Sequence, residues 1–508
     1  MLKILNRLLL EHDGHFIKDL SNIEKNTLNS LTIYSRNELI DKHDLDFITK
    51  LINMTELNSV QLVLNRCQSI PKNVFNNFDN LSQLTIASFS GSFEEFNFEY
   101  LKNLTTLILE KNELSKLESG IFNGLKNLDK LIFASNKIKL LKGKVFNNLT
   151  NLKELNLNKN DILQIENDAF NGLDNLKYLI LGSNGIKSFK KNCFIDLKNL
   201  STLDLSYNKM LDFEQNTLNG LINLEHLRLE GNLIETIKAN VFNELKNLKQ
   251  LDLNKNKISK LEDNAFYGLN SLENLFLINN QIETLNQYAF NHLKNLKKLF
   301  LYECKVKFID KNAFAGLINL EYLILEGNQV NFLEANVFND LKNLKELDLK
   351  RNKILELEQN VFAGLINLEN LNLGNNDLRL LKASVFSDLE NLKSLDISYN
   401  KIVTIEDNAF SGLIKLENLD LNNNLIVKLN RFTLNGFGKL KYLNLSTNKI
   451  NIIEQDTFSG LNNLLGLNLG VNQLIKLEKN IFIQLENLKN LDLNSNKISS
   501  LDEDTFTG

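Results

Sequence analysis

A cysteine interrupts a long series of asparagines in the middle of the chain and is the first candidate for chemistry. Cys304 lies in the stretch LFLYECKVKFIDKNAF, and Lys305 and Lys307 follow it closely. Two lysines could lower the pKa of an exposed thiol and make it a reactive nucleophile. The alternative is a buried thiol that takes the place of an asparagine, because S–H is itself a weak donor. The regular pattern on both sides favours the buried thiol.

The histidines are the second candidates, since imidazole and carboxylate together can bind a metal. The stretch EHDGH, residues 11–15, places His12 and His15 beside two carboxylates. It lacks a second group of ligands at a recognisable spacing, so a polar turn is the better interpretation. His226 and His292 stand alone, and no glycine-rich phosphate loop, GxSxG or HExxH occurs. We therefore expect no enzyme activity, cofactor or metal.

The overall charge points to neither nucleic acid nor an anionic membrane as a partner. The 58 basic residues nearly cancel the 62 acidic ones in the 508-residue chain. After Lys3 and Arg7 comes only a short apolar run, Leu8 to Leu10, which is too short for a secretory signal. No stretch approaches the roughly 18 apolar residues of a membrane span. Read from Met1, the sequence predicts a soluble chain with no evident secretion signal.

The elements that must position any site follow from an internal repeat. From Leu104 the pattern LTTLILEKNELSKLESGIFNGLKN returns every 24 residues. A phenylalanine ten residues after each asparagine is nearly as regular, from Phe122 to Phe506, and only Leu218 and Leu434 replace it. The asparagine itself occurs at Asn112, Asn136, Asn160, Asn184, Asn208, Asn232, Asn256, Asn280, Asn328, Asn352, Asn376, Asn400, Asn424, Asn448, Asn472 and Asn496.

The spacing of this repeat predicts the fold. LxxLxL alternates as a short strand does, with leucines inward and the residues between them outward. The asparagine amide can donate to and accept from backbone groups in the turn that follows. One coil cannot bury its own apolar side, so the coils must stack. We predict an α/β repeat solenoid, with a parallel β-sheet on the concave face and short irregular or helical turns on the convex face.

The repeat also defines the expected domains. Residues 1–56 form a divergent N-terminal capping segment, with a strand at LTIYS from Leu31 and a short helix at DLDFITKLINM. Residues 57–508 form the solenoid, with irregular coils over 57–103 and regular 24-residue coils over 104–508. The last coil stops at Gly508 without a polar cap, which would expose a strand edge. We expect truncation at this end or, alternatively, a partner or second copy that covers it, so a homodimer is possible.

Glycine occurs two positions after the phenylalanine in every second coil over much of the chain, as at Gly124 and Gly172, whereas Asn148 and Asp196 stand in the coils between. A two-coil unit has therefore been duplicated. Larger units were copied too, because GLINLEHLRLEGNLIETIKANVF from Gly220 closely matches GLINLEYLILEGNQVNFLEANVF from Gly316. Growth by copying suits an extended recognition surface better than a unique catalytic site.

With these residues in view, the chain resembles the leucine-rich repeat family, in the 24-residue class written LxxLxLxxNxIxxLxxxxFxxLxxL. The resemblance covers Leu57 to Gly508. Within this class, the chain is similar to Toll-type receptor ectodomains, Slit-like and chaoptin-like proteins and the insulin-like growth factor acid-labile subunit. The resemblance implies a horseshoe that binds proteins on its concave face, in an extracellular or cell-surface location.

Two features depart from those extracellular relatives. The cysteine-rich caps are missing, and Cys67, Cys193 and Cys304 lie in distant coils, too far apart for disulfides. N-x-S/T triplets do not decide the location, because an asparagine-rich chain produces several by chance. They begin at Asn53, Asn80, Asn103, Asn148, Asn199 and Asn444.

The outward strand residues predict a binding surface. Phe276, Phe300 and Ile324 are consecutive in a column that is otherwise mostly polar. Ile278, Tyr302 and Tyr322 lie beside them, and together the six predict an exposed aromatic-aliphatic patch for a protein ligand. The rim is expected to contain Arg228, Asp252, Lys298, Glu303 and Glu326. The alternative is that such residues only stabilise neighbouring strands. Asp396 to Asp420 is a weaker candidate for a basic partner.

These observations favour a non-enzymatic protein-recognition module that binds a protein ligand on its concave strand face. It would act as a receptor, adhesion or secreted recognition protein. Two alternatives remain open: an intracellular scaffold that assembles partners, and the targeting segment of a larger effector protein.

Overall fold

The computed structural model describes residues 8–12, 15–17, 30–35, 58–64, 75, 80–91, 98–501 and 503–506. The chain divides into two compact units, Met1–Asp252 and Leu253–Gly508. Each is a stack of 24-residue coils and is described by itself. The helix expected at DLDFITKLINM, and Cys67, lie outside the described residues.

The first unit is built on a row of parallel strands, one per coil. Most adjacent strands pair residue for residue at 24-residue steps, as Tyr178 pairs with Thr202, whereas Gln83 pairs with Thr106 at a step of 23. The strands are β4 (Ser59–Val63), β5 (Gln83–Ala87), β6 (Thr106–Ile108), β7 (Lys130–Ile132), β9 (Glu154–Asn156), β11 (Tyr178–Ile180), β12 (Thr202–Asp204), β13 (His226–Arg228) and β15 (Gln250–Asp252).

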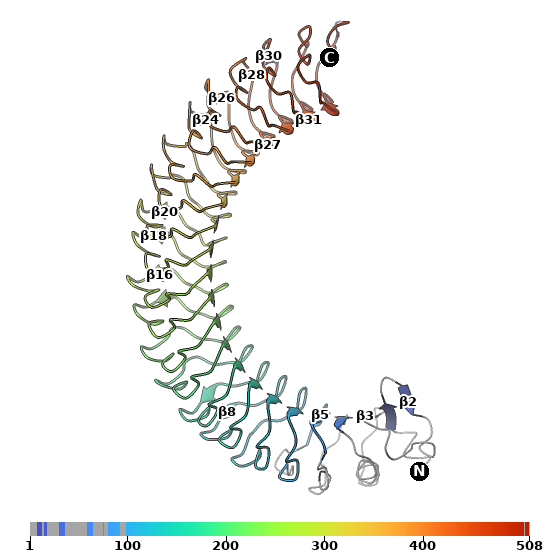
Figure 1. Ribbon diagram of the computed structural model, residues 1–508, viewed down its shortest axis with the longest axis vertical. Helices are drawn as coiled ribbons and strands as arrows, with labels where there is room; N and C mark the ends of the chain where they lie inside the picture. The colour runs from blue at the N-terminus through green and yellow to red at the C-terminus, as the bar shows by residue number, and fades with distance from the viewer. Residues whose placement is uncertain are drawn as a thin grey trace. The chain divides into compact units, whose positions relative to one another are not determined.

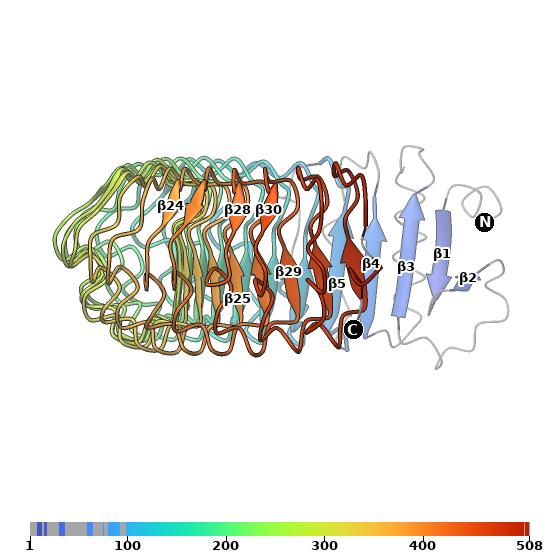
Figure 2. The same ribbon diagram turned by 90° about the horizontal axis from the view of Figure 1, so that it is seen from above.

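Antiparallel strands precede this row in the N-terminal segment. Strand β1 (Leu8–His12) pairs antiparallel with both β2 (His15–Ile17) and β3 (Ser30–Ser35), and β3 pairs parallel with β4. Figure 2 shows β1, β3, β4 and β5 side by side. The strand expected at LTIYS is therefore confirmed. A capping role for residues 1–56 stays a prediction.

The second unit repeats the parallel arrangement, and its strands lie on the inner, concave side of the unit (Figure 1). The pairing runs without a break from β17 to β32. The strands are β17 (Asn274–Phe276), β19 (Lys298–Phe300), β21 (Tyr322–Ile324), β22 (Glu346–Asp348), β23 (Asn370–Asn372), β25 (Ser394–Asp396), β27 (Asn418–Asp420), β29 (Tyr442–Asn444), β31 (Gly466–Asn468) and β32 (Asn490–Asp492).

The convex side of the coils consists mainly of turns with two-residue strands. No α-helix occurs in the part of the chain that the structure describes, so the irregular form of the expected convex turns is the one present. The short strands are β8 (Leu140–Leu141), β10 (Gln164–Ile165), β14 (Thr236–Ile237), β16 (Lys260–Leu261), β18 (Thr284–Leu285), β20 (Phe308–Ile309), β24 (Leu380–Leu381), β26 (Thr404–Ile405), β28 (Lys428–Leu429) and β30 (Ile452–Ile453).

Stacked layers of identical residue types form the core, as the repeat predicts. The strand leucines are buried, and the recurring phenylalanines stack from coil to coil. In the second unit the ring centroids of Phe290 and Phe314 are 6.4 Å apart, and those of Phe314 and Phe338 are 5.9 Å apart. Neighbouring coils thus bury the apolar side that one coil alone would expose. The predicted solenoid with a parallel sheet is confirmed.

The asparagine series ties each coil to the one before it. Asn376 is representative: its Nδ2 donates to the carbonyl oxygens of Leu349 and Leu373, each at 3.0 Å. Its Oδ1 accepts the N–H of Ile354, also at 3.0 Å. One buried amide thereby satisfies backbone groups of two coils, which explains why the position is so regular.

Candidate functional site

The floor of the candidate site consists of outward residues on β17, β19 and β21. The strand register places Phe276 beside Phe300 and Phe300 beside Ile324, while Lys298 lies beside Tyr322. The rings of Phe276 and Phe300 stack with centroids 5.1 Å apart and planes 6° apart. The middle residue of each strand, Leu275, Leu299 or Leu323, points the other way and is fully buried. Phe276, Phe300 and Ile324 therefore form a continuous apolar column across the three strands.

Ile278 and Tyr302 extend this surface just beyond the strand ends. The backbone N–H of Ile278 donates to Asn254 Oδ1 at 2.8 Å, and the Tyr302 carbonyl accepts the N–H of Asn279 at 2.9 Å. These bonds fix the backbone that carries both side chains. We call the six residues Phe276, Ile278, Phe300, Tyr302, Tyr322 and Ile324 the apolar patch.

The apolar patch is half-buried, which differs in degree from the exposed surface that the sequence suggests. All six residues have intermediate exposure. The physical reason is that adjacent strands lie about 4.8 Å apart, so large side chains in one column cover each other. The stacked Phe276 and Phe300 show this cover directly. The surface that stays accessible is the outer side of the side chains, held in place by neighbours.

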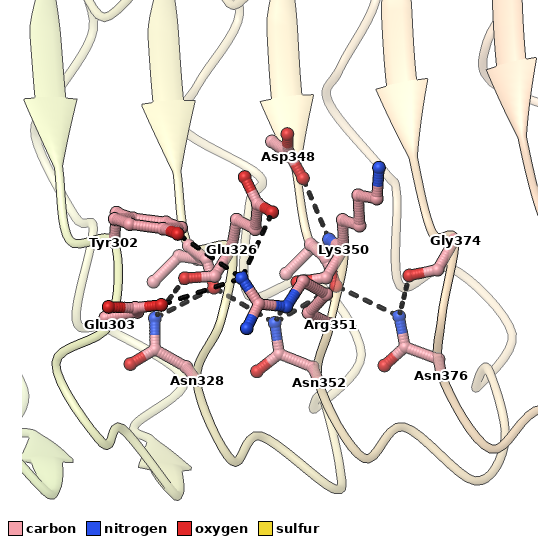
Figure 3. Close-up of polar contacts among 12 residues, drawn as sticks. Tyr302, Glu303, Glu326, Asn328, Asp348, Lys350, Arg351, Asn352, Gly374 and Asn376 are labelled. Atoms are coloured by element: carbon pink, nitrogen blue, oxygen red, sulfur yellow. Dashed lines mark hydrogen bonds and ion pairs between the residues drawn. The ribbon is translucent and has the colours of Figure 1, made fainter.

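Arg351 borders the apolar patch on one side. Its Nη1 lies 3.3 Å from the Tyr302 hydroxyl, 3.6 Å from Glu303 Oε1 and 3.9 Å from Glu326 Oε1. Figure 3 shows the guanidinium turned toward these three side chains. The contact between Arg351 and Tyr302 joins two coils that are not adjacent. It crosses the coil between them, which contains Gly327. A Cβ at Gly327 would lie 2.9 Å from Glu303 Cγ, so the glycine leaves room for this cluster.

Lys298 provides a second charged border. Its Nζ lies 5.1 Å from the centre of the Tyr322 ring, and the side chain is otherwise exposed. A cation over an aromatic face is attracted to the ring and shields part of it. Lys298, Glu303 and Glu326 thus lie next to the apolar patch as expected. Arg228 and Asp252 belong to the first unit, where Arg228 lies 3.8 Å from Asp204.

The strand after the patch introduces a half-buried carboxyl group. Asp348 pairs with Ile324 in the strand register, and its Oδ1 accepts the N–H of Lys350 at 2.8 Å. Burial raises the pKa of Asp348 to about 6, and the charges of Glu326 and Glu346 act in the same direction. The N–H and the charge of Lys350 oppose this rise. The site therefore changes here from apolar to negatively charged.

Beyond Asp348 the concave face of the second unit is polar. The last residue of each later strand is Asp or Asn, and its Oδ1 accepts the N–H two residues on, as in Asp396 to Ser398 at 2.9 Å and Asn372 to Gly374 at 2.9 Å. These bonds end the strands. A groove of about 860 Å³ runs along β25, β27, β29, β31 and β32, with Asp396, Asp420 and Tyr442 in its lining.

A column of alternating charges lies along the start of the strands and was not among the features predicted from the sequence. In the second unit, four lysines of this column each pair with the glutamate of the preceding coil. The pairs are Lys297–Glu273 at 3.0 Å, Lys345–Glu321 at 2.7 Å, Lys393–Glu369 at 2.8 Å and Lys441–Glu417 at 2.7 Å. The signal was present in the sequence, because Glu and Lys alternate immediately before successive strands. It has the same two-coil period as the glycines.

Cys304 fills the asparagine position as a buried thiol. Its Sγ donates to the Leu277 carbonyl at 2.9 Å, and burial raises its pKa to about 12. Asn328 Oδ1 accepts the N–H groups of both Cys304 and Val306, at 3.0 and 2.9 Å. The reactive-thiol hypothesis is therefore wrong and the buried thiol is confirmed. Cys193 is likewise free and buried, with a pKa raised to about 12.

Other sequence candidates take no part in this site. His12 and His15 are backbone partners in the pairing of β1 with β2. Within the described ranges, no group of three or more His, Cys, Asp or Glu side chains is placed to hold a metal ion. The same ranges contain no helix that is long and apolar enough to cross a membrane.

Comparison with known proteins places the fold. A family described as "BspA type Leucine rich repeat region" matches residues 139–273, 213–345 and 259–393. A second, "Leucine rich repeat", matches 102–162, 366–426 and 414–474, and a third description of the same repeat matches 487–508. A search of curated proteins gives no match.

Solved structures share the architecture. Toll of Drosophila, in a complex with Spatzle, aligns with a TM-score of 0.64 at 21% identity, over 89% of this chain and 65% of that one. The leucine-rich repeat protein LIC12759 of Leptospira interrogans aligns with a TM-score of 0.54 at 29% identity, over 79% and 86%. PEPR1, in a complex with AtPEP1, gives 0.53 at 20% identity, over 91% and 68%.

This chain thus spans less than two thirds of the Toll chain that it resembles. The overlapping matches of the first family description run from 139 to 393, which is half of the chain, and both units have the stacked 24-residue coils of that repeat. The protein therefore belongs to the leucine-rich repeat family.

Proposed function

We propose that this chain is a non-enzymatic protein-recognition module, and that its second unit binds a protein ligand through the apolar patch. One observation carries the proposal. Six large apolar or aromatic side chains gather on three adjacent strands and just beyond their ends, on a face whose following strands carry only Asp, Asn, Glu, Ser, Tyr or Gly outward.

The packing of the apolar patch suits binding energetics. Aromatic side chains surrounded by polar ones are the usual anatomy of a binding hot spot. The stacking of Phe276 on Phe300, and the Arg351 contact with Tyr302, hold these side chains before any ligand arrives. Association then costs less side-chain entropy than it would with mobile residues. A partner side chain can bury the remaining apolar surface without rearranging the sheet.

The comparisons give general support. Toll and PEPR1 have this fold and were each solved in a complex, with Spatzle and AtPEP1 respectively. We therefore favour a receptor, adhesion or secreted recognition role. Catalysis finds no support in the candidate residues, because the thiols of Cys193 and Cys304 are buried and no cluster of metal ligands accompanies the patch in the described chain.

The test is a double substitution, Phe300→Asp with Tyr302→Asp. It places two charges on the apolar patch, and loss of two hot-spot aromatics weakens binding by at least 2 kcal/mol, or about 30-fold. Immobilised chain is used to capture partners, which are identified by mass spectrometry and titrated. Circular dichroism and the melting temperature check folding, and Phe300→Ala with Tyr302→Ala serves if the aspartates unfold the chain.

The matched control is Phe308→Asp with Phe332→Asp. Phe308 lies in the same coil as Phe300, and Phe332 lies in the next coil. Both are on the convex side and are 50% and 43% exposed, respectively. The control should capture the same partners as the unsubstituted chain. Unchanged capture by a correctly folded Phe300 and Tyr302 variant would exclude the apolar patch as the main binding surface.

A further inference from the structure

The concave face of the second unit is chemically polarised along the stack. Its outward strand residues on β17, β19 and β21 include four large apolar or aromatic side chains, Phe276, Phe300, Tyr322 and Ile324, beside Asn274 and Lys298. From β22 to β32 they include five carboxylates and neither lysine nor arginine. Those carboxylates are Glu346, Asp348, Asp396, Asp420 and Asp492.

We infer that the ligand of the apolar patch is an extended protein segment with one large apolar side chain for the patch, followed by basic side chains that lie across β22 to β27. This rests on the proposed function for the apolar anchor, and it adds the chemistry and direction of the ligand residues after that anchor. Charge complementarity along an open sheet face is the physical ground, because it selects partners and fixes their register.

Cations near this surface do not cancel its charge. Lys345, Lys393 and Lys441 precede the strands, and each pairs with a glutamate at 2.7 or 2.8 Å. Arg351 is shared between Glu303 and Glu326, which leaves that cluster with one net negative charge. The groove lining also contains Lys489, at the far end next to β32. Lys350 follows strand β22, and its charge acts on Asp348. With Lys350 counted, the strand face between Ile324 and Lys489 still keeps an excess of carboxylates, because Glu346, Asp348, Asp396 and Asp420 outnumber it.

The carboxylates in the groove are held but not neutralised. Asp396 Oδ1 accepts the Ser398 N–H at 2.9 Å and hydroxyl at 2.6 Å, and Asp420 Oδ1 accepts the Asn422 N–H at 2.9 Å. These donors are uncharged and occupy one oxygen of each carboxylate. Asp420 Oδ2 also lies 3.3 Å from Asn444 Nδ2. Fixed carboxylates of this kind suit the planar donors of an arginine.

Tyr442 adds an aromatic wall to the groove. It is 51% exposed, and its ring leans over the next coil, because a Cβ at Gly466 would lie 3.0 Å from Tyr442 Cδ1. The glycine leaves space for the ring. An exposed aromatic face beside carboxylates can stack with a guanidinium and contact the methylene groups of a long basic side chain.

The geometry also sets a spacing for the ligand. With strands about 4.8 Å apart, Asp348 lies roughly 10 Å from Phe300, and Asp396 roughly 19 Å. An extended peptide advances about 3.4 Å per residue. Basic residues about three and six positions after the anchor would therefore reach Asp348 and Asp396.

The experiment uses three fluorescein-labelled peptides and the full chain in about 50 mM salt, where screening is weak. The first has one tryptophan, with arginines three, six and nine positions later, separated by glycine and serine. The second has glutamine for each arginine, and the third has glycine for the tryptophan. Binding is measured by fluorescence anisotropy. We expect the first peptide to bind at least tenfold more tightly than either of the others.

The key variant is Asp396→Asn with Asp420→Asn. Asparagine already occupies this position in β23, where Asn372 makes the same turn bond, so the fold should tolerate it. The variant should reduce the advantage of arginine over glutamine to threefold or less. Glu390→Gln with Glu486→Gln changes the net charge equally at two exposed residues outside the groove lining. That control should keep the tenfold preference.

Two outcomes separate this inference from the proposed function. Equal binding of the arginine and glutamine peptides, with loss of both in the Phe300→Asp and Tyr302→Asp variant, overturns the basic segment but keeps the apolar patch. Tight binding of the peptide without tryptophan, unchanged by that variant, counts against the patch itself. Sedimentation of the chain alone tests a second copy as occupant: a dimer that the Phe300 and Tyr302 substitutions dissociate would overturn the inference.

Discussion

A single carboxyl group, Asp348, marks the change from apolar to acidic surface on the second unit. It lies beside Ile324, and its Oδ1 ends strand β22 by accepting the Lys350 N–H. The turn bond needs an acceptor oxygen but no charge, since Asn372 and Asn468 make the same bond in other coils at 2.9 Å. The charge of Asp348 is therefore a feature beyond what the turn requires.

Asp348→Asn should stabilise the protein at neutral pH. Burial raises the pKa of Asp348 from 3.8 to about 6, so the folded state binds this proton more tightly than the unfolded state. The stabilisation from protonation is fully present below pH 4 and is lost as the pH rises through 6. After a discount for partial exposure, the variant should gain about 1 kcal/mol at pH 7.5.

This gain should shrink toward zero near pH 4, where the wild-type carboxyl is neutral as well. Chemical unfolding of both proteins at intervals from pH 4 to 8 measures the difference, and other titrating groups cancel in it. A difference that stays constant across this range would show that the effect comes from packing and not from the charge of Asp348.

At the scale of the coil, glycine explains why the repeat has a two-coil period. Gly124, Gly172, Gly220, Gly364 and Gly412 all have positive φ, and an added Cβ would meet backbone atoms of the preceding coil. At Gly364 that Cβ would lie 2.3 Å from the Asn339 carbonyl oxygen. The coils of these five glycines therefore approach the preceding coil closely on this side, which a side chain would prevent. Gly316 and Gly460 of the same series have no such close approach.

Three alanine substitutions in the second unit separate the two reasons for glycine. Gly364 has φ +87° and the close backbone, Gly436 has φ +93° with nothing within 4 Å, and Gly438 has open space without a positive φ. We expect Gly436→Ala to cost about 1–2 kcal/mol of unfolding free energy and Gly364→Ala clearly more. Gly438→Ala should be near neutral. Equal losses at Gly364 and Gly436 would show that backbone conformation alone sets the requirement.

The sequence predicts the coil well because its spacing repeats, and it predicts the site only in part. The inward leucines and the asparagine amides recur every 24 residues, so their burial and partners follow from one coil. The cluster of Arg351 with Tyr302 and Glu303 does not follow from one coil. In it, Arg351 reaches past Gly327 to a coil two steps away. The half-burial of Phe276 and Phe300 likewise depends on stacking between strands.

At the scale of the molecule, each unit is held together by contacts between successive coils. The asparagine bonds join residues 22 to 27 positions apart, as from Asn376 to Ile354 and Leu349. The Lys–Glu pairs join residues 24 positions apart, such as Lys345 and Glu321. Stability in such a stack is a sum over coils and their interfaces with nearest neighbours. A local defect should therefore weaken its own neighbourhood most.

Hydrogen exchange in the Gly364→Ala variant tests this expectation. Exchange of strand amides should accelerate most in β21 and β22, the strands of the two coils that meet where Gly364 approaches Asn339, and much less in β31 of the same unit or in β7 and β9 of the first unit. The reason is that opening one interface leaves distant interfaces intact, so local opening requires less free energy than global unfolding. Mass spectrometry of peptic fragments, compared with Gly438→Ala, resolves the strands. Uniform acceleration in all strands would mean that the chain unfolds as one cooperative block, and the nearest-neighbour description would then fail.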